Sequence, residues 1–176
     1  MADAEYPRIE VTPFWARIND QLMEVVDSLT DDELSRRPAP GVWSVREHMV
    51  HLIGGRIGPM DSDMRPLDTL PTDFIERCQD REGLKEQLRA SWARMERFLA
   101  DSRQLDAMYT PPPADPELFR GIAEGPPDYP TEPGPDSGHF IAYHRLVHDV
   151  HHRACIFNVV EQLGITLHGV RRLHPL

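Results

Sequence analysis

The sequence predicts an all-α protein, a four-helix bundle with a long proline-rich loop before the last helix. Three observations predict this fold class. Four segments carry apolar residues at three- and four-residue spacing, no segment shows sustained apolar–polar alternation between hairpin turns, and nine of the 17 prolines fall within residues 111–135. The 176 residues are enough for one domain with a real core, so we expect residues 1–176 to form a single bundle.

The first two helices are predicted from apolar periodicity and from an end signal. The first is expected at about residues 12–28, where apolar residues recur at helical spacing. The second is expected at about residues 44–58 and begins with a capping box, in which Ser44 and Glu47 satisfy each other's backbone N–H groups. The glycine pair Gly54-Gly55 and the Gly-Pro pair that follows it are expected to end this helix.

The second half of the chain supplies the other two helices and the loop between them. The third helix is expected at about residues 82–101 and the fourth at about 137–163. Prolines prevent a long helix in residues 106–136, which we expect to form a loop with at most one helical turn. Two shorter segments, residues 31–36 and 72–78, are expected to form a turn or two of helix.

Composition and charge narrow the possible partners. The net charge of −10 argues against a nucleic-acid backbone or an anionic membrane as the main partner. No apolar run approaches the ~20 residues needed to cross a bilayer, and the N-terminus has no signal-peptide pattern. The two cysteines, Cys78 and Cys155, form no CxxC motif and are expected to stay reduced, which favours a cytoplasmic location.

The histidines are the candidate functional residues. His148 and His152 are four residues apart on the predicted fourth helix, so they share a face and can approach one ion. On the predicted second helix, His48 and His51 also share a face, and either can supply a third ligand. Three imidazoles leave coordination positions open, as in catalytic sites, and they suit Zn, Ni, Fe or Cu better than Mg or Ca. Alternatively, these histidines are ordinary core or solvated side chains without a metal.

Two motifs resemble one known family. The stretch WSVREHMVHL, residues 43–52, and the stretch HDVHHR, residues 148–153, resemble in order and spacing the motifs of the DinB/YfiT-like superfamily. That resemblance implies a four-helix bundle that holds a divalent metal ion (Zn, Ni, Fe or Mn) on three histidines. By position these are His51, His148 and His152, with His48 as a neighbour.

The resemblance also implies a class of function. It predicts a homodimeric enzyme that activates a low-molecular-weight bacterial thiol of the bacillithiol type, or water, for S-transfer or hydrolysis of a small-molecule substrate. The alternative is a helical dimer that binds metal or serves a stress response without turnover. No residue is assigned as a catalytic acid or base. Glu47, His48 and Asp149 are candidates to hold the ligating imidazoles through hydrogen bonds, although both carboxylates are also compatible with an exposed position.

Overall fold

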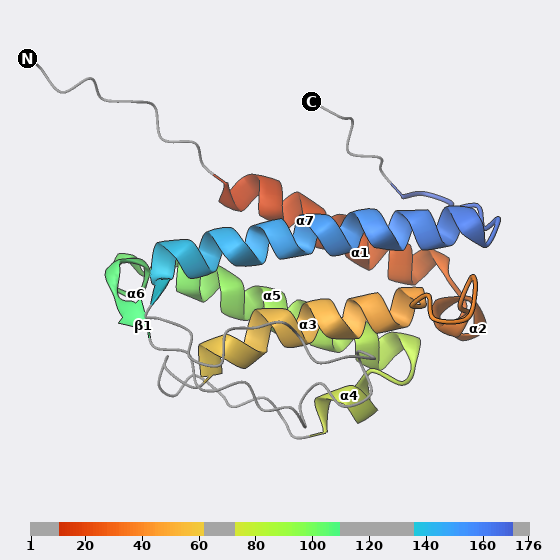
Figure 1. Cartoon of the computed structure of the whole chain (residues 1–176), viewed down its shortest axis with the longest axis horizontal. Helices are drawn as coiled ribbons and strands as arrows, with labels where there is room; N and C mark the ends of the chain where they lie inside the picture. Colours follow the sequence, from red (N-terminus) through yellow and green to blue (C-terminus); the bar gives the residue numbers. More distant parts are fainter. Residues whose placement is uncertain (1–10, 62–72, 110–135, 171–176) are drawn as a thin grey trace, which may run out of the picture.

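The computed structural model describes residues 11–61, 73–109 and 136–170, and these parts form seven helices and two very short strands (Figure 1). Four of the helices are long. These are α1 (Thr12–Ser28), α3 (Val45–Asp61), α5 (Arg81–Ala100) and α7 (Gly138–Gln162). The short elements are α2 (Asp31–Ser35), α4 (Phe74–Arg77), α6 (Ser102–Asp106), β1 (Met108–Tyr109) and β2 (Asp136–Ser137). The all-α prediction is confirmed.

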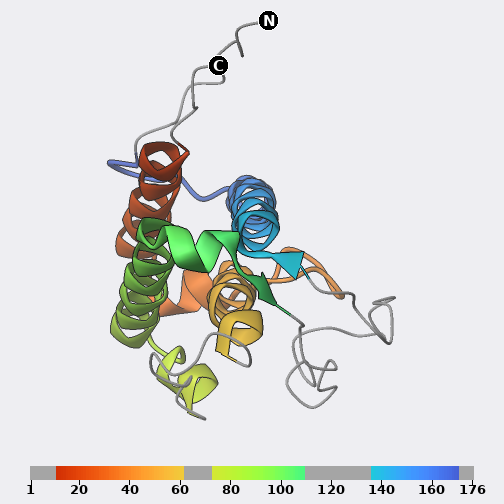
Figure 2. The same ribbon diagram turned by 90° about the vertical axis from the view of Figure 1, so that its left-hand side faces the viewer.

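The long helices pack around a common core. Viewed from the end, α1, α5, α3 and α7 lie in that order around the core, and each contacts the next (Figure 2). Because α3 and α7 are neighbours, side chains from the two motif segments of the sequence can meet. None of the helices in the described ranges is both long and apolar enough to cross a membrane.

The core consists of two clusters of buried apolar side chains. The larger cluster joins α1, α3, α5 and α7 through residues such as Leu22, Met49 and Ile156. The smaller cluster surrounds Trp15 on α1 and Trp92 on α5, whose ring centroids lie 5.8 Å apart. Burying aromatic side chains of this size stabilises the contact between these two helices.

Helix ends follow the signals in the sequence. The Ser44 hydroxyl accepts a hydrogen bond from the Glu47 N–H at 3.2 Å, and the Glu47 carboxylate accepts one from the Ser44 N–H at 2.7 Å, so the predicted capping box is confirmed. The Ser137 side chain caps α7 by accepting from Phe140 N–H at 3.1 Å. Just beyond α7, Gly164 adopts a φ of +66°, the left-handed conformation that glycine accommodates at a helix end.

One sequence expectation needs correction, and a second concerns residues that lie mostly outside the described ranges. The helix α3 runs to Asp61, three residues beyond the expected end at about residue 58, so neither Gly54-Gly55 nor the Gly-Pro pair that follows it ends the helix. Glycine inside a helix costs only about 1 kcal/mol relative to alanine, and packing with neighbouring helices offsets that cost. Most of the expected loop at 106–136 lies outside the described residues, and its two flanks pair as the antiparallel strands β1 and β2.

Candidate metal centre

Three histidines on α3 and α7 come together between the two helices. One ring nitrogen from each of His51, His148 and His152 lies within 4.8 Å of the others. The α7 pair is one helical turn apart, with ring centroids 4.4 Å from each other, and the His51 ring lies 4.6 Å from that of His152. The structure therefore brings together the three residues expected as ligands.

The nitrogen separations suit a shared ion. His148 Nε2 and His51 Nε2 are 3.1 Å apart. Two nitrogen ligands at 2.0–2.1 Å from one tetrahedral ion would lie about 3.3 Å apart, so a small adjustment satisfies both bonds. The same 3.1 Å also suits an N–H···N hydrogen bond between two neutral imidazoles, which would satisfy the pair without an ion.

His48 lies next to this cluster and contacts it through His152. The Nδ1 atoms of the two rings are 3.1 Å apart, which is a hydrogen-bond distance. If His152 donates through Nδ1–H, its Nε2 keeps a lone pair for a metal ion. The position of His48 is consistent with a residue that orients a ligand.

Burial and neighbouring imidazoles favour the neutral form of His48, His51 and His152. Burial, followed by the charge that His148 carries when protonated, lowers the pKa of His51 to about 4 and that of His152 to about 2. Burial also lowers the pKa of His48, although the nearby carboxylate of Glu47 acts in the opposite direction. Metal ligation requires neutral imidazole, so at neutral pH no proton has to be removed from the rings of His51 and His152 before they bind an ion.

Two residues outside the ligand set shape the cluster. A Cβ atom added at Gly55 on α3 would come within 2.7 Å of His148 Cε1, so only glycine allows this ring to lie so close to the α3 backbone. Trp43, just before α3, has its ring centroid 5.2 Å from that of His51, and its ring stacks on His152 at 6.3 Å. Trp43 was not among the candidate site residues, so its contact with the imidazoles was missed.

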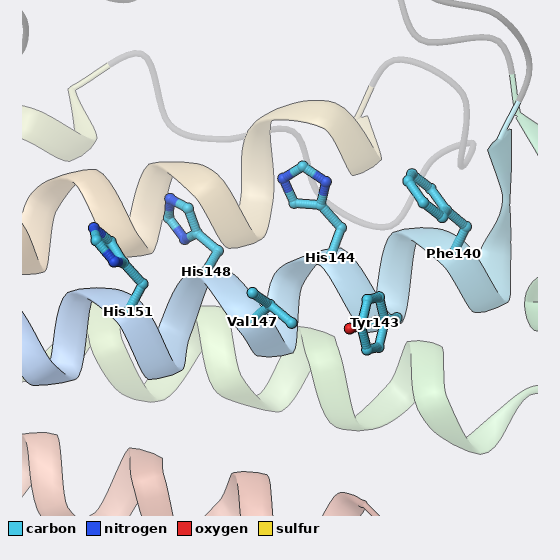
Figure 3. A pocket seen from close by; sticks show the side chains of 6 residues that line it. All are labelled: Phe140, Tyr143, His144, Val147, His148 and His151. Atoms are coloured by element: carbon cyan, nitrogen blue, oxygen red, sulfur yellow. The ribbon is translucent and has the colours of Figure 1, made fainter.

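An open, mostly apolar groove of about 350 Å³ runs along α7 and includes His148 among its lining residues. Its other lining residues are Phe140, Tyr143, His144, Val147 and His151. Figure 3 shows these side chains in a row along α7, with α3 running beside them. His144 and His151 are exposed and lie outside the three-histidine cluster.

The two carboxylates proposed to hold the imidazoles occupy different environments. Glu47 accepts hydrogen bonds from the Ser44 N–H and from Arg37, and no described hydrogen bond joins it to a histidine. Asp149 is fully buried, which excludes the exposed position considered from the sequence. Its Oδ1 atom lies 3.9 Å from Nδ1 of His148.

The sequence-based reasoning missed the charged partner of Asp149. Arg56 on α3 is also fully buried, and its Nε donates to Asp149 Oδ2 at 2.8 Å. The spacing of Arg56 from Leu52 and Ile53 offered a signal, because it places the guanidinium on the apolar face of α3. A charged residue on such a face requires a buried partner.

The comparisons with known proteins agree with this fold. A sequence model described as the DinB superfamily matches residues 15–156. The crystal structure of a DinB-like protein from Bacillus cereus ATCC 10987 superposes with a TM-score of 0.56 at 16% identity, covering 90% of this chain and 94% of that one. No curated protein matches the chain. Because the superfamily model spans most of the sequence, and the bundle fold accompanies it, the chain belongs to the DinB superfamily.

Proposed function

We propose that this protein is a metal-dependent enzyme that holds a divalent ion on His51, His148 and His152. The observation that carries the proposal is the convergence of three imidazole nitrogens from two helices within 4.8 Å. All-histidine donors suit Zn, Ni or Fe, and Mn is a further candidate. Three protein ligands would leave a coordination position for a small molecule, which distinguishes such a site from a closed structural one.

A bound divalent ion would supply one chemical effect, a lower pKa for a coordinated thiol or water. The chain's own residues would bind the substrate and orient it. The groove along α7 offers apolar walls next to His148, and Tyr143 and Phe140 suit an apolar or aromatic part of a substrate. The Trp43 ring packs against the rings of His51 and His152 and would help to hold them in place. We propose S-transfer with a low-molecular-weight thiol, or hydrolysis with water, as the reaction class.

The proposal extends to the setting of the protein. The two free cysteines support a cytoplasmic location, and the family resemblance supports a homodimer. The acidic net charge of −10 argues against nucleic acid as a partner. The molar mass in solution, measured by light scattering, tests the dimer. A monomer at working concentration would remove that part of the proposal and leave the metal site untouched.

A second candidate function is metal binding without turnover, as in a stress-response protein. One observation favours it: no carboxylate of the described residues forms a hydrogen bond to any of the three clustered histidines, so no described carboxylate is positioned beside the cluster as an acid or base. General acid–base catalysis needs such a group within hydrogen-bond reach.

Metal analysis of untagged protein is the decisive experiment. We expect near-stoichiometric metal in the wild type and its loss in His152→Ala. The matched control is His144→Ala, which removes an exposed imidazole from the same helix and should keep the metal content. Screening metal-loaded protein with bacterial thiols and electrophiles then separates the two functions. Equal metal in all three samples, or none after loading, would refute the proposed site.

A further inference from the structure

A buried ion pair lies directly beneath the three-histidine cluster. Asp149 on α7 and Arg56 on α3 are both fully buried, and the Arg56 Nε–H donates to Asp149 Oδ2 at 2.8 Å. The indole N–H of Trp15 on α1 donates to the same oxygen at 2.5 Å. Arg56 Nη1 also donates to Asn19 Oδ1 at 2.9 Å and to Ser91 Oγ at 3.3 Å, so the network includes a residue from each long helix.

Stability alone does not account for this network. Removing two charges from water is costly, and their attraction offsets that cost only when the remaining polar atoms also find partners. Here they do not, because Oδ1 of Asp149 and Nη2 of Arg56 have no hydrogen-bond partner among the described residues. Apolar side chains would fill the same space at a lower cost in free energy, so the buried carboxylate requires an explanation other than stability.

The free carboxylate oxygen lies close to a second atom without a partner. Nδ1 of His148 is buried, lacks a hydrogen bond within the described parts of the chain, and lies 3.9 Å from Asp149 Oδ1. The side chains of adjacent residues on a helix point in directions about 100° apart around the axis, so they do not ordinarily contact each other. A shift of roughly 1 Å would bring these two atoms to hydrogen-bond distance.

We propose that Asp149 is the positioning residue for His148: its Oδ1 accepts the His148 Nδ1–H and thereby leaves the Nε2 lone pair free for the metal ion. This inference deepens the proposed function and rests on it. Nε2 is the atom that lies 3.1 Å from His51 Nε2, so the tautomer selected by Asp149 directs the correct nitrogen into the cluster. Arg56 holds the other oxygen and sets the orientation of the carboxylate, and the Trp15 N–H adds a second hydrogen bond to that same oxygen.

The variant Asp149→Asn tests the proposal because the amide would reverse the hydrogen bond. Two donors, from Arg56 and Trp15, hold the inner oxygen, so the amide oxygen should take that place and the NH₂ group should face His148. A donor facing Nδ1 favours the tautomer protonated at Nε2, which cannot bind a metal through that atom. We expect zinc affinity to fall by about 10- to 100-fold, the usual effect of losing such a partner.

Trp15→Phe is the matched control. It removes the indole N–H bound to the same carboxylate and enlarges the space in the buried aromatic cluster, but it leaves Oδ1 facing His148. We expect lower stability and near-wild-type zinc affinity, measured by chelator competition at a temperature where both variants are folded. An equal loss of affinity in the two variants would show that the network acts only as a scaffold, and would overturn the proposal.

The tautomer of His148 is read directly by nitrogen NMR of ¹⁵N-histidine-labelled protein. In the wild type, with or without zinc, we expect the proton on Nδ1, and in Asp149→Asn we expect it on Nε2. A wild-type ring protonated at Nε2, or a wild-type affinity in Asp149→Asn, would overturn the inference. If Asp149→Asn does not fold, the wild-type spectrum alone decides. If the wild type binds no metal, the proposed function fails, and a proton on Nε2 would refute this inference separately.

Discussion

Replacing Gly55 by alanine tests whether the His148 ring lies against α3 as the structure places it. An added Cβ would meet His148 Cε1 at 2.7 Å and Nδ1 at 3.2 Å. Carbon atoms in contact ordinarily lie 3.5–4.0 Å apart, so the ring has to move by roughly 1 Å. Such a movement is large beside a metal–nitrogen bond of about 2.0–2.1 Å, and we expect it to remove His148 from the cluster.

The neighbouring glycine provides the control. At Gly54 the added Cβ would lie 3.5 Å from Phe74 Cζ, an ordinary contact. Both substitutions gain about 1 kcal/mol of helix propensity, and the His148 ring can swing outward because its side chain retains 17% exposure. We therefore expect neither variant to lose metal-free stability. Zinc affinity should stay near wild type in Gly54→Ala and fall by at least about 100-fold in Gly55→Ala, more than for the loss of an outer partner.

The assay combines urea unfolding of metal-free protein with chelator competition for zinc. Stability and affinity are thus measured separately for each variant. If Gly55→Ala bound zinc like the wild type, His148 would not be a ligand in the observed orientation, and the geometry of the proposed site would be wrong. A similar loss in Gly54→Ala would show instead that any change in this turn of α3 disturbs the site.

Three further outcomes follow from charge and burial. Burial and neighbouring imidazoles lower the pKa of His51 to about 4 and that of His152 to about 2, so both rings take up protons when the metal-free protein unfolds below pH 6.5. The free energy of unfolding should therefore be highest above pH 6.5 and fall toward pH 4 by up to about 1.4 kcal/mol per pH unit for each ring. A free energy that does not change with pH, measured by urea unfolding, would contradict this. Burial raises the pKa of the Cys78 thiol to about 12, so a thiol reagent at pH 8 should label only the partly exposed Cys155 until the chain unfolds. Rapid labelling of both cysteines in the folded protein would refute this prediction. Arg56→Ala leaves its buried carboxylate partner unpaired and should lower the free energy of unfolding by about 3–5 kcal/mol, whereas a loss below about 1 kcal/mol would show that the ion pair contributes little.

Local signals made most of the fold predictable. Apolar periodicity marked the four long helices to within a few residues, and the Ser44–Glu47 capping box marked the start of α3. The reason for Gly55 within α3 was not predictable in this way, because Gly55 makes room for a side chain from α7 that lies 93 residues further along the sequence. A glycine that serves a distant contact has the same local signature as one that ends a helix.

The site was only partly predictable from the sequence, because some of its contacts join residues that are far apart along the chain. Spacing indicated that His148 and His152 share a face, but the choice of His51 over His48 came from the family pattern, and both lie beside the α7 pair. Asp149 lies at helical spacing from the buried His152 and Ile156, which could have indicated its burial. Its partners Arg56 and Trp15 come from other helices, and only the packed bundle brings them together.

The separation of the histidines along the chain has a consequence for the unfolded state. His51 and His148 are 97 residues apart, and one ion bound to both would act as a reversible cross-link that closes a loop of that length. An ion that stayed on both residues in the unfolded chain would restrict the unfolded ensemble by roughly 4–5 kcal/mol, as a disulfide would, in a chain whose two cysteines are both free. An ion that is released on unfolding would instead stabilise the folded chain through its binding free energy. The free energy of unfolding of such a bundle would increase with the concentration of free metal ion.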